Sequence, residues 1–302
     1  MRTIFLGTSE YAVSVLERLA SSEFRPALVL TPPDRRQGRG RRLAPPPAAT
    51  AARELGLDLA QVDSVNDASA LERIRASEPD VGLVCAFGQL IREPLLSELE
   101  LLNVHPSLLP RWRGAAPIAR AIMAGDSETG VTIMRVTEGL DSGSIALQRT
   151  VAIADEDDYG ALADRLARLG GELAVRALEL RRDGKLTPTE QDDSLATYAN
   201  KIAPEERRLD PGRPAAALAR TVRALTPRVG AYLGLEGGER LGVTEAVAEP
   251  GELEPGTVEA DAGELRVGCA EGVLRIDAVQ PPGKRPMPVD AYLRGHPVPR
   301  LP

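Results

Sequence analysis

The stretch "LLNVHPSLLP", residues 101–110, carries the side chains best suited to chemistry. His105 is one of only two histidines among 302 residues, and Asn103 lies two positions before it. Pro106 favours an extended conformation at His105, and the two-residue period of a strand places Asn103 and His105 on one face. A carboxamide beside an imidazole suits acyl transfer, because the amide can stabilise a developing oxyanion and the ring can move protons.

An imidazole that acts as an acid or base needs a third group that orients it and stabilises its charge. The best candidate is Asp141 in "TEGLDSGS", a turn that follows an apolar segment at 130–136. Other interpretations compete on local grounds, because a single histidine near a strand end is more often structural and "GLDSG" is most often only a turn. By themselves these residues predict an α/β protein with a candidate acid–base site.

The elements that must position this site alternate between strand and helix in the first part of the chain. Patterning predicts buried strands at 3–7, 27–31, 80–86 and 130–136, with helices at 10–22, 47–55, 67–77, 115–124 and 158–184. The alternation predicts a doubly wound, mostly parallel, Rossmann-like α/β sheet. Ligands of such sheets bind at the carboxyl ends of the strands, where residues 103–110 fall.

The second part of the chain changes character. Residues 185–206 are polar and contain prolines, which predicts a linker. One helix at 214–225 follows, and then short apolar segments alternate with Gly, Pro and acidic turns. This spacing predicts a small antiparallel barrel or sandwich. We therefore expect a catalytic domain at 1–184, a linker at 185–206 and a β-domain at 207–302.

Composition narrows the class of protein. The net charge of −7 argues against a protein that coats nucleic acid unselectively. Cys85 and Cys269 match no metal or disulfide spacing, and we expect reduced cysteines and no metal. No run of 18 apolar residues and no signal peptide stands out, so we expect a soluble cytoplasmic protein without a membrane span.

A second informative stretch is "PDRRQGRGRRL", residues 33–43. Its arginines, among them Arg36, Arg39, Arg41 and Arg42, are interleaved with glycines directly after a predicted strand. A basic, glycine-rich loop at a ligand-binding edge can shape itself around phosphates. The competing interpretation is a solvated loop without a ligand.

The string "NVHPSLLPRWRGAAPIARAIMAGDSETGVTIMRVTEGLDSGSI", residues 103–145, closely resembles the core of the 10-formyltetrahydrofolate-dependent formyltransferases, within them the enzymes that act on methionyl-tRNA. The family signature Asn-x-His-x-Ser-Leu-Leu-Pro is complete here. The resemblance extends to "IFLGTSEYAVSVLERL", "TPPDRRQGRGRRLAPPP", "YANKIAPEERRLD" and "QPPGKRPMPVDAYLRG". It implies that the C-terminal part is an OB-like barrel that contacts tRNA.

The resemblance also implies roles. Asn103 would be the oxyanion donor, and His105 and Asp141 would handle protons and charge as the amine attacks directly, without a formyl-enzyme intermediate. The donor 10-formyltetrahydrofolate would contact the turn formed by Ser107, Leu108, Leu109 and Pro110. The acceptor would be initiator methionyl-tRNA, bound by Arg36, Arg39, Arg41, Arg42, Lys284 and Arg285. On resemblance we expect a monomer.

Departures from the family pattern leave alternatives open. Residues 204–302 hold 13 basic and 15 acidic residues, so RNA contact would need a localised face. Formyltransferases that act on glycinamide ribonucleotide or on amino sugars share the Asn, His and Asp set. The Arg-rich loop, "PRWRGAAPI" and the C-terminal domain favour the tRNA interpretation. An RNA-binding module without catalysis is the remaining alternative, and the intact set argues against it.

Overall fold

The computed structural model describes residues 1–37 and 42–302. The chain forms two compact units. Unit 1 comprises Met1–Gly114, Thr129–Ala152 and Ala163–Tyr198, and unit 2 comprises Ala115–Glu128, Ile153–Leu162 and Ala199–Pro302. Each unit thus collects segments from several parts of the sequence.

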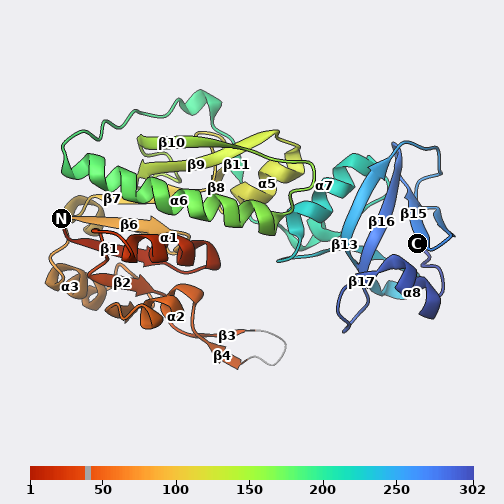
Figure 1. The fold of residues 1–302 in the computed structure, drawn as a ribbon, viewed down its shortest axis with the longest axis horizontal. Coiled ribbons are helices and arrows are strands. Elements are labelled where there is room, and N and C mark those ends of the chain that lie inside the picture. The colour runs from red at the N-terminus through yellow and green to blue at the C-terminus, as the bar shows by residue number, and fades with distance from the viewer. Residues whose placement is uncertain (38–41) are drawn as a thin grey trace. The chain divides into compact units, whose positions relative to one another are not determined.

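The described part of unit 1 contains a seven-stranded sheet in the order β10-β9-β7-β6-β1-β2-β5 (Figure 1). The chain runs from β1 to one edge through β2 and β5, then returns to the other side through β6 and β7. These strands pair in parallel, whereas β9 is antiparallel to β7. The predicted doubly wound, mostly parallel sheet is confirmed. The bounds are β1 Thr3–Gly7, β2 Leu28–Thr31, β5 Leu59–Gln61, β6 Val81–Cys85, β7 Leu101–His105, β9 Glu128–Arg135 and β10 Ile145–Ala152.

The central strand β1 shows why the sheet is buried on both faces. Ile4 and Leu6 pack in a core cluster with Leu71 of α3 (Ala68–Ala76) and Leu95 of α4 (Leu95–Glu98). Phe5 points the other way, because a β-carbon on Gly7 would meet both Phe5 and Ala12 of α1 (Glu10–Ala20). Successive residues therefore serve opposite layers, and an unbroken apolar run is the expected sequence pattern.

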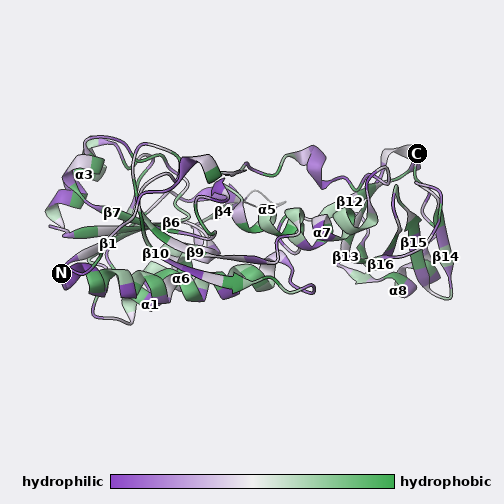
Figure 2. Cartoon of the chain, turned by 90° about the horizontal axis from the view of Figure 1, so that it is seen from above, coloured by the Kyte–Doolittle hydropathy of each residue, from purple (hydrophilic) through white to green (hydrophobic). Residues whose placement is uncertain are grey.

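The helix α6 (Tyr159–Arg182) packs closely against β7 (Figure 1). A β-carbon on Gly170 would lie 2.9 Å from Val104 Cγ1 and 3.2 Å from the Tyr11 hydroxyl oxygen. The Tyr11 hydroxyl donates to the Leu166 carbonyl at 3.2 Å, which joins α1 to α6. Figure 2 shows α6 with hydrophobic and hydrophilic patches along its length, as expected of a helix with one buried face.

The remaining short elements of unit 1 include one that patterning missed. The arginine-rich stretch contains a two-stranded hairpin of β3 (Arg35–Gln37) and β4 (Arg42–Ala44). Arg36 and Arg42 lie in this hairpin, whereas Arg39 and Arg41 lie outside the described residues. The helix α2 (Pro47–Glu54) follows. Ser9 occupies the N-cap position of α1 without a side-chain hydrogen bond, and the Thr8 hydroxyl donates to the Phe87 carbonyl at 2.6 Å instead.

The described part of unit 2 is built on an antiparallel sheet, as predicted for the OB-like domain. Its order is β12-β13-β16-β15-β14, with β17 paired to β16. Strand β13 has a register irregularity between Val243 and Ala246, where the antiparallel ladder with β16 shifts. The bounds are β12 Ala231–Gly234, β13 Arg240–Glu249, β14 Val258–Asp261, β15 Glu264–Gly268, β16 Val273–Gln280 and β17 Met287–Pro288.

Helices cover the core of unit 2. The helix α7 (Ala215–Leu225) buries Leu218 and Val222 among strand residues such as Leu233 and Ile276. The helix α5 (Pro117–Ala124) belongs to this unit, and the Arg220 guanidinium on α7 donates to the Met123 carbonyl at 3.2 Å. The short α8 (Val289–Gly295) places Tyr292 against His296 in a stacked pair. His296 itself is exposed.

Candidate active site

Strand β7 brings the two central residues of the site together. Asn103 pairs with Met134 of β9 and His105 with Thr132, while Val84 of β6 pairs with Asn103 on the other side. Both side chains lie on one face of the strand, because Val104 between them points to α6. His105 is only 4% exposed, and Asn103 is partly buried. The sheet therefore holds the candidate pair rigidly at a strand end.

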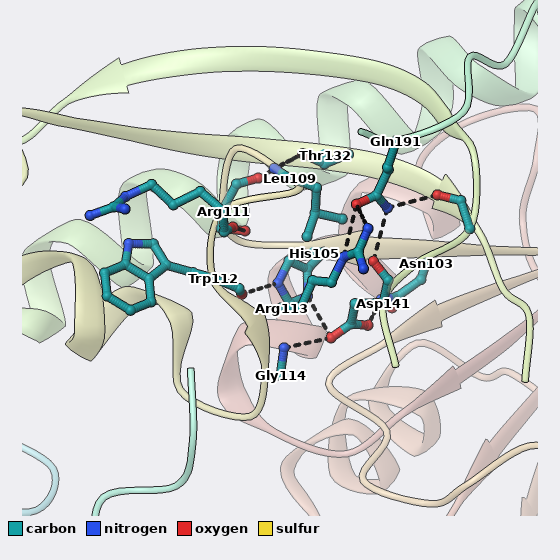
Figure 3. Close-up of polar contacts among 12 residues, drawn as sticks. Asn103, His105, Leu109, Arg111, Trp112, Arg113, Gly114, Thr132, Asp141 and Gln191 are labelled. Atoms are coloured by element: carbon teal, nitrogen blue, oxygen red, sulfur yellow. Dashed lines mark hydrogen bonds and ion pairs between the residues drawn. The ribbon is translucent and has the colours of Figure 1, made fainter. Parts of the chain in front are cut away.

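The imidazole has a defined tautomer. His105 Nε2 lies 2.9 Å from the Trp112 carbonyl oxygen, which can only accept, so Nε2 carries the proton and Nδ1 of the neutral ring has a free lone pair. Trp112 directs its carbonyl inward by adopting a φ of 64°, which is uncommon for a bulky residue. Its indole points away from His105, and the Arg111 guanidinium lies 4.5 Å from its centroid (Figure 3).

Asp141 faces the same pair from a loop after β9 (Figure 3). Its Oδ2 lies 3.7 Å from His105 Nδ1, and its Oδ1 lies 3.5 Å from the Asn103 amide nitrogen. The Gly114 N–H donates to the same Oδ2 at 2.8 Å. The three residues predicted from sequence therefore converge, and a carboxylate stands where it can stabilise a protonated ring.

The turn after β7 is fixed by buried hydrogen bonds. The Ser107 hydroxyl, fully buried, donates to the Arg111 carbonyl at 2.7 Å. Thr132 on β9 donates to the Ser107 carbonyl at 2.6 Å and accepts from the Leu109 N–H at 3.2 Å. Gln148 on β10 donates to the Leu109 carbonyl at 3.0 Å. Ser107 and Leu109 are therefore internal parts of the turn, whereas Leu108 and Pro110 are partly exposed.

A second set of contacts, which sequence reasoning missed, holds the Asp141 loop. The Gln191 amide donates to the carbonyl oxygens of Asp141 at 2.8 Å and Gly143 at 2.7 Å. Its own oxygen accepts two hydrogen bonds from the Arg113 guanidinium, at 3.0 and 2.8 Å. Gln191 lies in the polar stretch expected to be a linker, and no local pattern marks such a long-range contact.

The remaining candidates lie at the surface. Arg36, Arg42, Lys284 and Arg285 are exposed, as a phosphate-binding role requires. Cys85 at the end of β6 is fully buried, and burial raises the pKa of its thiol, so it stays neutral. Within residues 1–37 and 42–302, no group of three His, Cys, Asp or Glu side chains is placed to hold a metal ion. No helix in the same ranges is long and apolar enough to span a bilayer.

The chain is similar to known proteins over nearly its whole length. Residues 1–178 match the family described as formyl transferase, and residues 201–297 match the formyl transferase C-terminal domain. The methionyl-tRNA formyltransferase of Methylococcus capsulatus is 44% identical over 299 residues, covering 98% of this chain and 97% of that protein. The protein of the same name from Halorhodospira halophila is 44% identical over 298 residues, covering 97% and 96%.

Solved structures share the fold. The N-formyltransferase of Helicobacter canadensis, in complex with folinic acid and dTDP-3-aminofucose, has a TM-score of 0.67 at 14% identity, covering 91% of this chain and 98% of that one. HypX of Aquifex aeolicus, in complex with tetrahydrofolic acid, has a TM-score of 0.65 at 20% identity, covering 98% and 47%. With both domains matched and curated relatives similar over nearly the whole length, the chain belongs to the methionyl-tRNA formyltransferase family of enzymes.

Proposed function

We propose that this chain transfers the formyl group of 10-formyltetrahydrofolate to the α-amino group of methionine on initiator methionyl-tRNA, in support of translation initiation. The observation that carries the proposal is the convergence of Asn103, His105 and Asp141 at the end of β7, with atoms of Asp141 within 3.7 Å of both other side chains. The full-length similarity to methionyl-tRNA formyltransferases supports the choice of acceptor. A cytoplasmic location remains a prediction from the composition, and a monomeric state remains a prediction from the resemblance.

The residues present fit a formyl donor. A formyl oxygen needs a hydrogen-bond donor, and the Asn103 amide has two N–H groups, of which Asp141 accepts from one at the long distance of 3.5 Å. The donor 10-formyltetrahydrofolate supplies a carbonyl carbon bonded to a nitrogen that can leave. Among the residues proposed to contact it, Leu108 and Pro110 are accessible, and Ser107 and Leu109 would act by shaping the turn.

The protein side of the reaction follows from the tautomer of His105. Asn103 would donate to the formyl oxygen as negative charge builds on it. The Nδ1 lone pair of His105 would accept the proton that the methionine amine loses as its new C–N bond forms, and the ring would return a proton to the leaving nitrogen. Asp141 would stabilise the imidazolium between these steps. The Trp112 carbonyl would keep the ring oriented throughout.

RNA binding would use the exposed arginines and lysines. Arg36 lies on β3 and Arg42 on β4, and we propose that Arg39 and Arg41, which lie outside the described residues, act with them. Lys284 and Arg285 follow β16 in the C-terminal domain, proposed at residues 207–302. Each phosphate contact releases counterions, so affinity should fall steeply with salt.

One assay with several acceptors tests the proposal. With 10-formyltetrahydrofolate as donor, purified protein should formylate initiator methionyl-tRNA and leave glycinamide ribonucleotide and amino sugars unmodified. His105→Ala should abolish transfer while tRNA affinity stays within about twofold, since a catalytic histidine contributes mainly in the transition state. Efficient formylation of either small acceptor in place of the tRNA would refute the proposal.

Salt dependence tests the RNA-binding residues separately. The double variant Lys284→Ala, Arg285→Ala should reduce the slope of log affinity against log salt by roughly 1 to 2. Lys185→Ala, which removes an exposed lysine of unit 1 outside the proposed set, is the matched control. An unchanged slope in the double variant would remove these two residues from the RNA interface.

A further inference from the structure

The stretch Thr189–Thr197, which we name the connector, lies along two loops of the active site. Thr189 and Ile145 exchange two backbone hydrogen bonds, of 2.8 and 2.9 Å. At its other end, the Thr197 N–H donates to the Pro110 carbonyl at 3.2 Å, and the Thr197 carbonyl accepts from the Arg113 N–H at 2.9 Å. The Thr197 hydroxyl accepts from the Trp112 N–H at 2.9 Å. The connector is thus fastened both to the loop after Asp141 and to the loop that holds His105.

The connector matches neither family domain. The formyl transferase match ends at residue 178, and the C-terminal match begins at residue 201. Its sequence is polar and lacks the periodicity of a buried element. Its contacts, however, are those of a structural part of the site.

Gln191 forms the central contact of the connector. Both of its amide hydrogens are used, on the carbonyls of Asp141 and Gly143, while its oxygen accepts twice from Arg113. Arg113 is only 4% exposed, and its guanidinium also contacts Asp193 at 2.6 Å. A buried guanidinium with fixed partners can point the Gln191 amide in only one orientation, with its oxygen to Arg113 and its nitrogen to the loop.

The Asp141 loop has an unusual backbone conformation where Gln191 contacts it. Asp141 has a φ of 48°, a conformation that side chains other than glycine, Asn and Asp adopt rarely. Two residues on, Gly143 has no room for a β-carbon, which would overlap the Arg135 carbonyl oxygen. The loop therefore passes close to β9 in an unusual conformation, and Gln191 fixes the carbonyls of both residues.

We propose that Gln191, oriented by Arg113, is a positioning residue that holds the Asp141 carboxylate in register with His105 and Asn103. The proposal rests on the catalytic role proposed for Asp141. The connector would then help to position the Asp141 carboxylate in the active site, in addition to linking the two parts of the chain. A displacement of the carboxylate by about 1 Å is enough to cost on the order of 10²-fold in turnover.

Gln191→Glu is the sharpest test, because it keeps the acceptor for Arg113 and removes both N–H donors without changing size. Gln191→Met removes the donors without adding charge and serves if the first variant folds poorly. Asp192→Asn is the matched control, since this exposed neighbour bonds Ser194 within the connector. We expect kcat to fall on the order of 10- to 100-fold in both Gln191 variants, with KM for tRNA within about threefold.

The scarcity of histidine provides a readout that does not depend on the reaction. Imidazole NMR signals of the full chain come only from His105 and the exposed His296, and His296→Gln assigns them. In Gln191→Glu and Gln191→Met the His105 signals should move while those of His296 stay in place. Asp192→Asn should change neither kcat nor the His105 signals.

Each result has a defined meaning. Unchanged kcat in folded Gln191 variants, or a loss of kcat with unmoved His105 signals, would overturn the positioning role. If the wild-type protein fails to formylate methionyl-tRNA but the His105 signals still respond to Gln191→Glu, the proposed function fails and the positioning contact stands. If the wild-type protein is active but its His105 signals are insensitive to Gln191, the proposed function stands and the positioning role fails.

Discussion

Two non-glycine residues have nearly the same positive φ, and different contacts hold each of them in that conformation. Asp141 in unit 1 has a φ of 48°, and Ala262 in unit 2 has a φ of 49°. Asp141 is held by distant partners, since its carbonyl accepts from Gln191 and its carboxylate accepts from Gly114. Ala262 is exposed, at a two-residue turn between the paired residues Asp261 and Glu264. A similar positive φ is thus held by tertiary contacts at the site and by local turn geometry in the β-domain.

At Asp141 and Trp112 the positive φ lies beside the candidate active site, whereas at Ala262 it belongs to a local turn. Backbone strain clusters at functional sites when surrounding contacts over-determine it. Trp112, at a φ of 64°, fits this account because its carbonyl contacts the His105 imidazole, for which we propose a catalytic role. Variants in the Asp141 loop and in the β-domain can test whether only the contacts in the Asp141 loop affect turnover.

The largest effect is expected from Asp141→Asn. Asparagine tolerates the positive φ and can still accept from the Gly114 N–H, so the fold should be preserved. The negative charge opposite His105 is lost, and kcat should fall on the order of 10²- to 10⁴-fold. Steady-state kinetics and thermal unfolding measure the two quantities. A severe loss of stability with the kcat of the folded fraction intact would show that the carboxylate is structural.

A matched pair of glycine substitutions gives the next largest effect. A β-carbon at Gly143 would overlap the Arg135 carbonyl, and one at Gly268 would overlap the Glu254 carbonyl. Both variants to Ala should lose roughly 1 to 3 kcal/mol of stability. Only Gly143→Ala should also lower kcat, on the order of 10- to 100-fold, because it displaces the Asp141 loop. Equal kcat values for the two folded variants would show that the packing at Gly143 is no more important for turnover than the packing at Gly268.

A gain in stability is expected at the β14–β15 turn. Ala262 precedes Gly263 in a turn where both have positive φ, a geometry that favours Asn-Gly. Ala262→Asn should therefore stabilise unit 2 by about 0.5 to 1 kcal/mol. Denaturant unfolding would measure the gain, and kcat should be unaffected. A destabilised variant would mean that contacts of Ala262, and not its backbone, set the preference.

The smallest effect concerns an ion pair in unit 2. A hydrogen bond from Arg120 lowers the pKa of the Glu206 carboxyl below its ordinary value. A lowered folded-state pKa stabilises the protein above the unfolded pKa, near about 4.3, and this contribution is lost as the pH falls through the folded-state value. Glu206→Gln should thus cost less than about 1 kcal/mol at pH 7, because the pair is partly exposed.

The pH dependence of that variant is the decisive control. The difference in unfolding free energy between wild type and Glu206→Gln should shrink as the pH falls below about 4. A difference that stays constant with pH would indicate lost packing or a lost neutral hydrogen bond instead of the charge.

Sequence patterning predicted several elements with largely buried residues. The strand predicted at 3–7 is β1, and the helices predicted at 10–22, 158–184 and 214–225 are α1, α6 and α7 within two residues at each end. Patterning missed the eight-residue β10, and it missed β5 and the β3–β4 hairpin, which are three-residue strands whose pairing depends on distant partners. Local periodicity carries little information for segments that short.

For the site, the sequence pattern identified the side chains and missed their supports. Asn103 and His105 share a face because they are two residues apart on a strand, which is a local property. Asp141 was placed by resemblance and by its turn, and the structure brings it to the pair. Gln191 and the Trp112 carbonyl act through hydrogen bonds across 50 and 7 positions, set by the tertiary fold.

The close packing of Gly170 against Val104 of β7 limits how the donor specificity of the site can be redesigned. With Val104 Cγ1 2.9 Å from where a β-carbon would stand, the strand that bears Asn103 and His105 has no space to retreat toward α6. Room for a bulkier acyl donor must therefore be created on the face of β7 that bears Asn103 and His105. The segments around residues 110–114 and 139–145 are the ones to remodel. Libraries that vary position 170 should yield mostly inactive clones, and those that vary the two loops are where altered donor specificity should emerge.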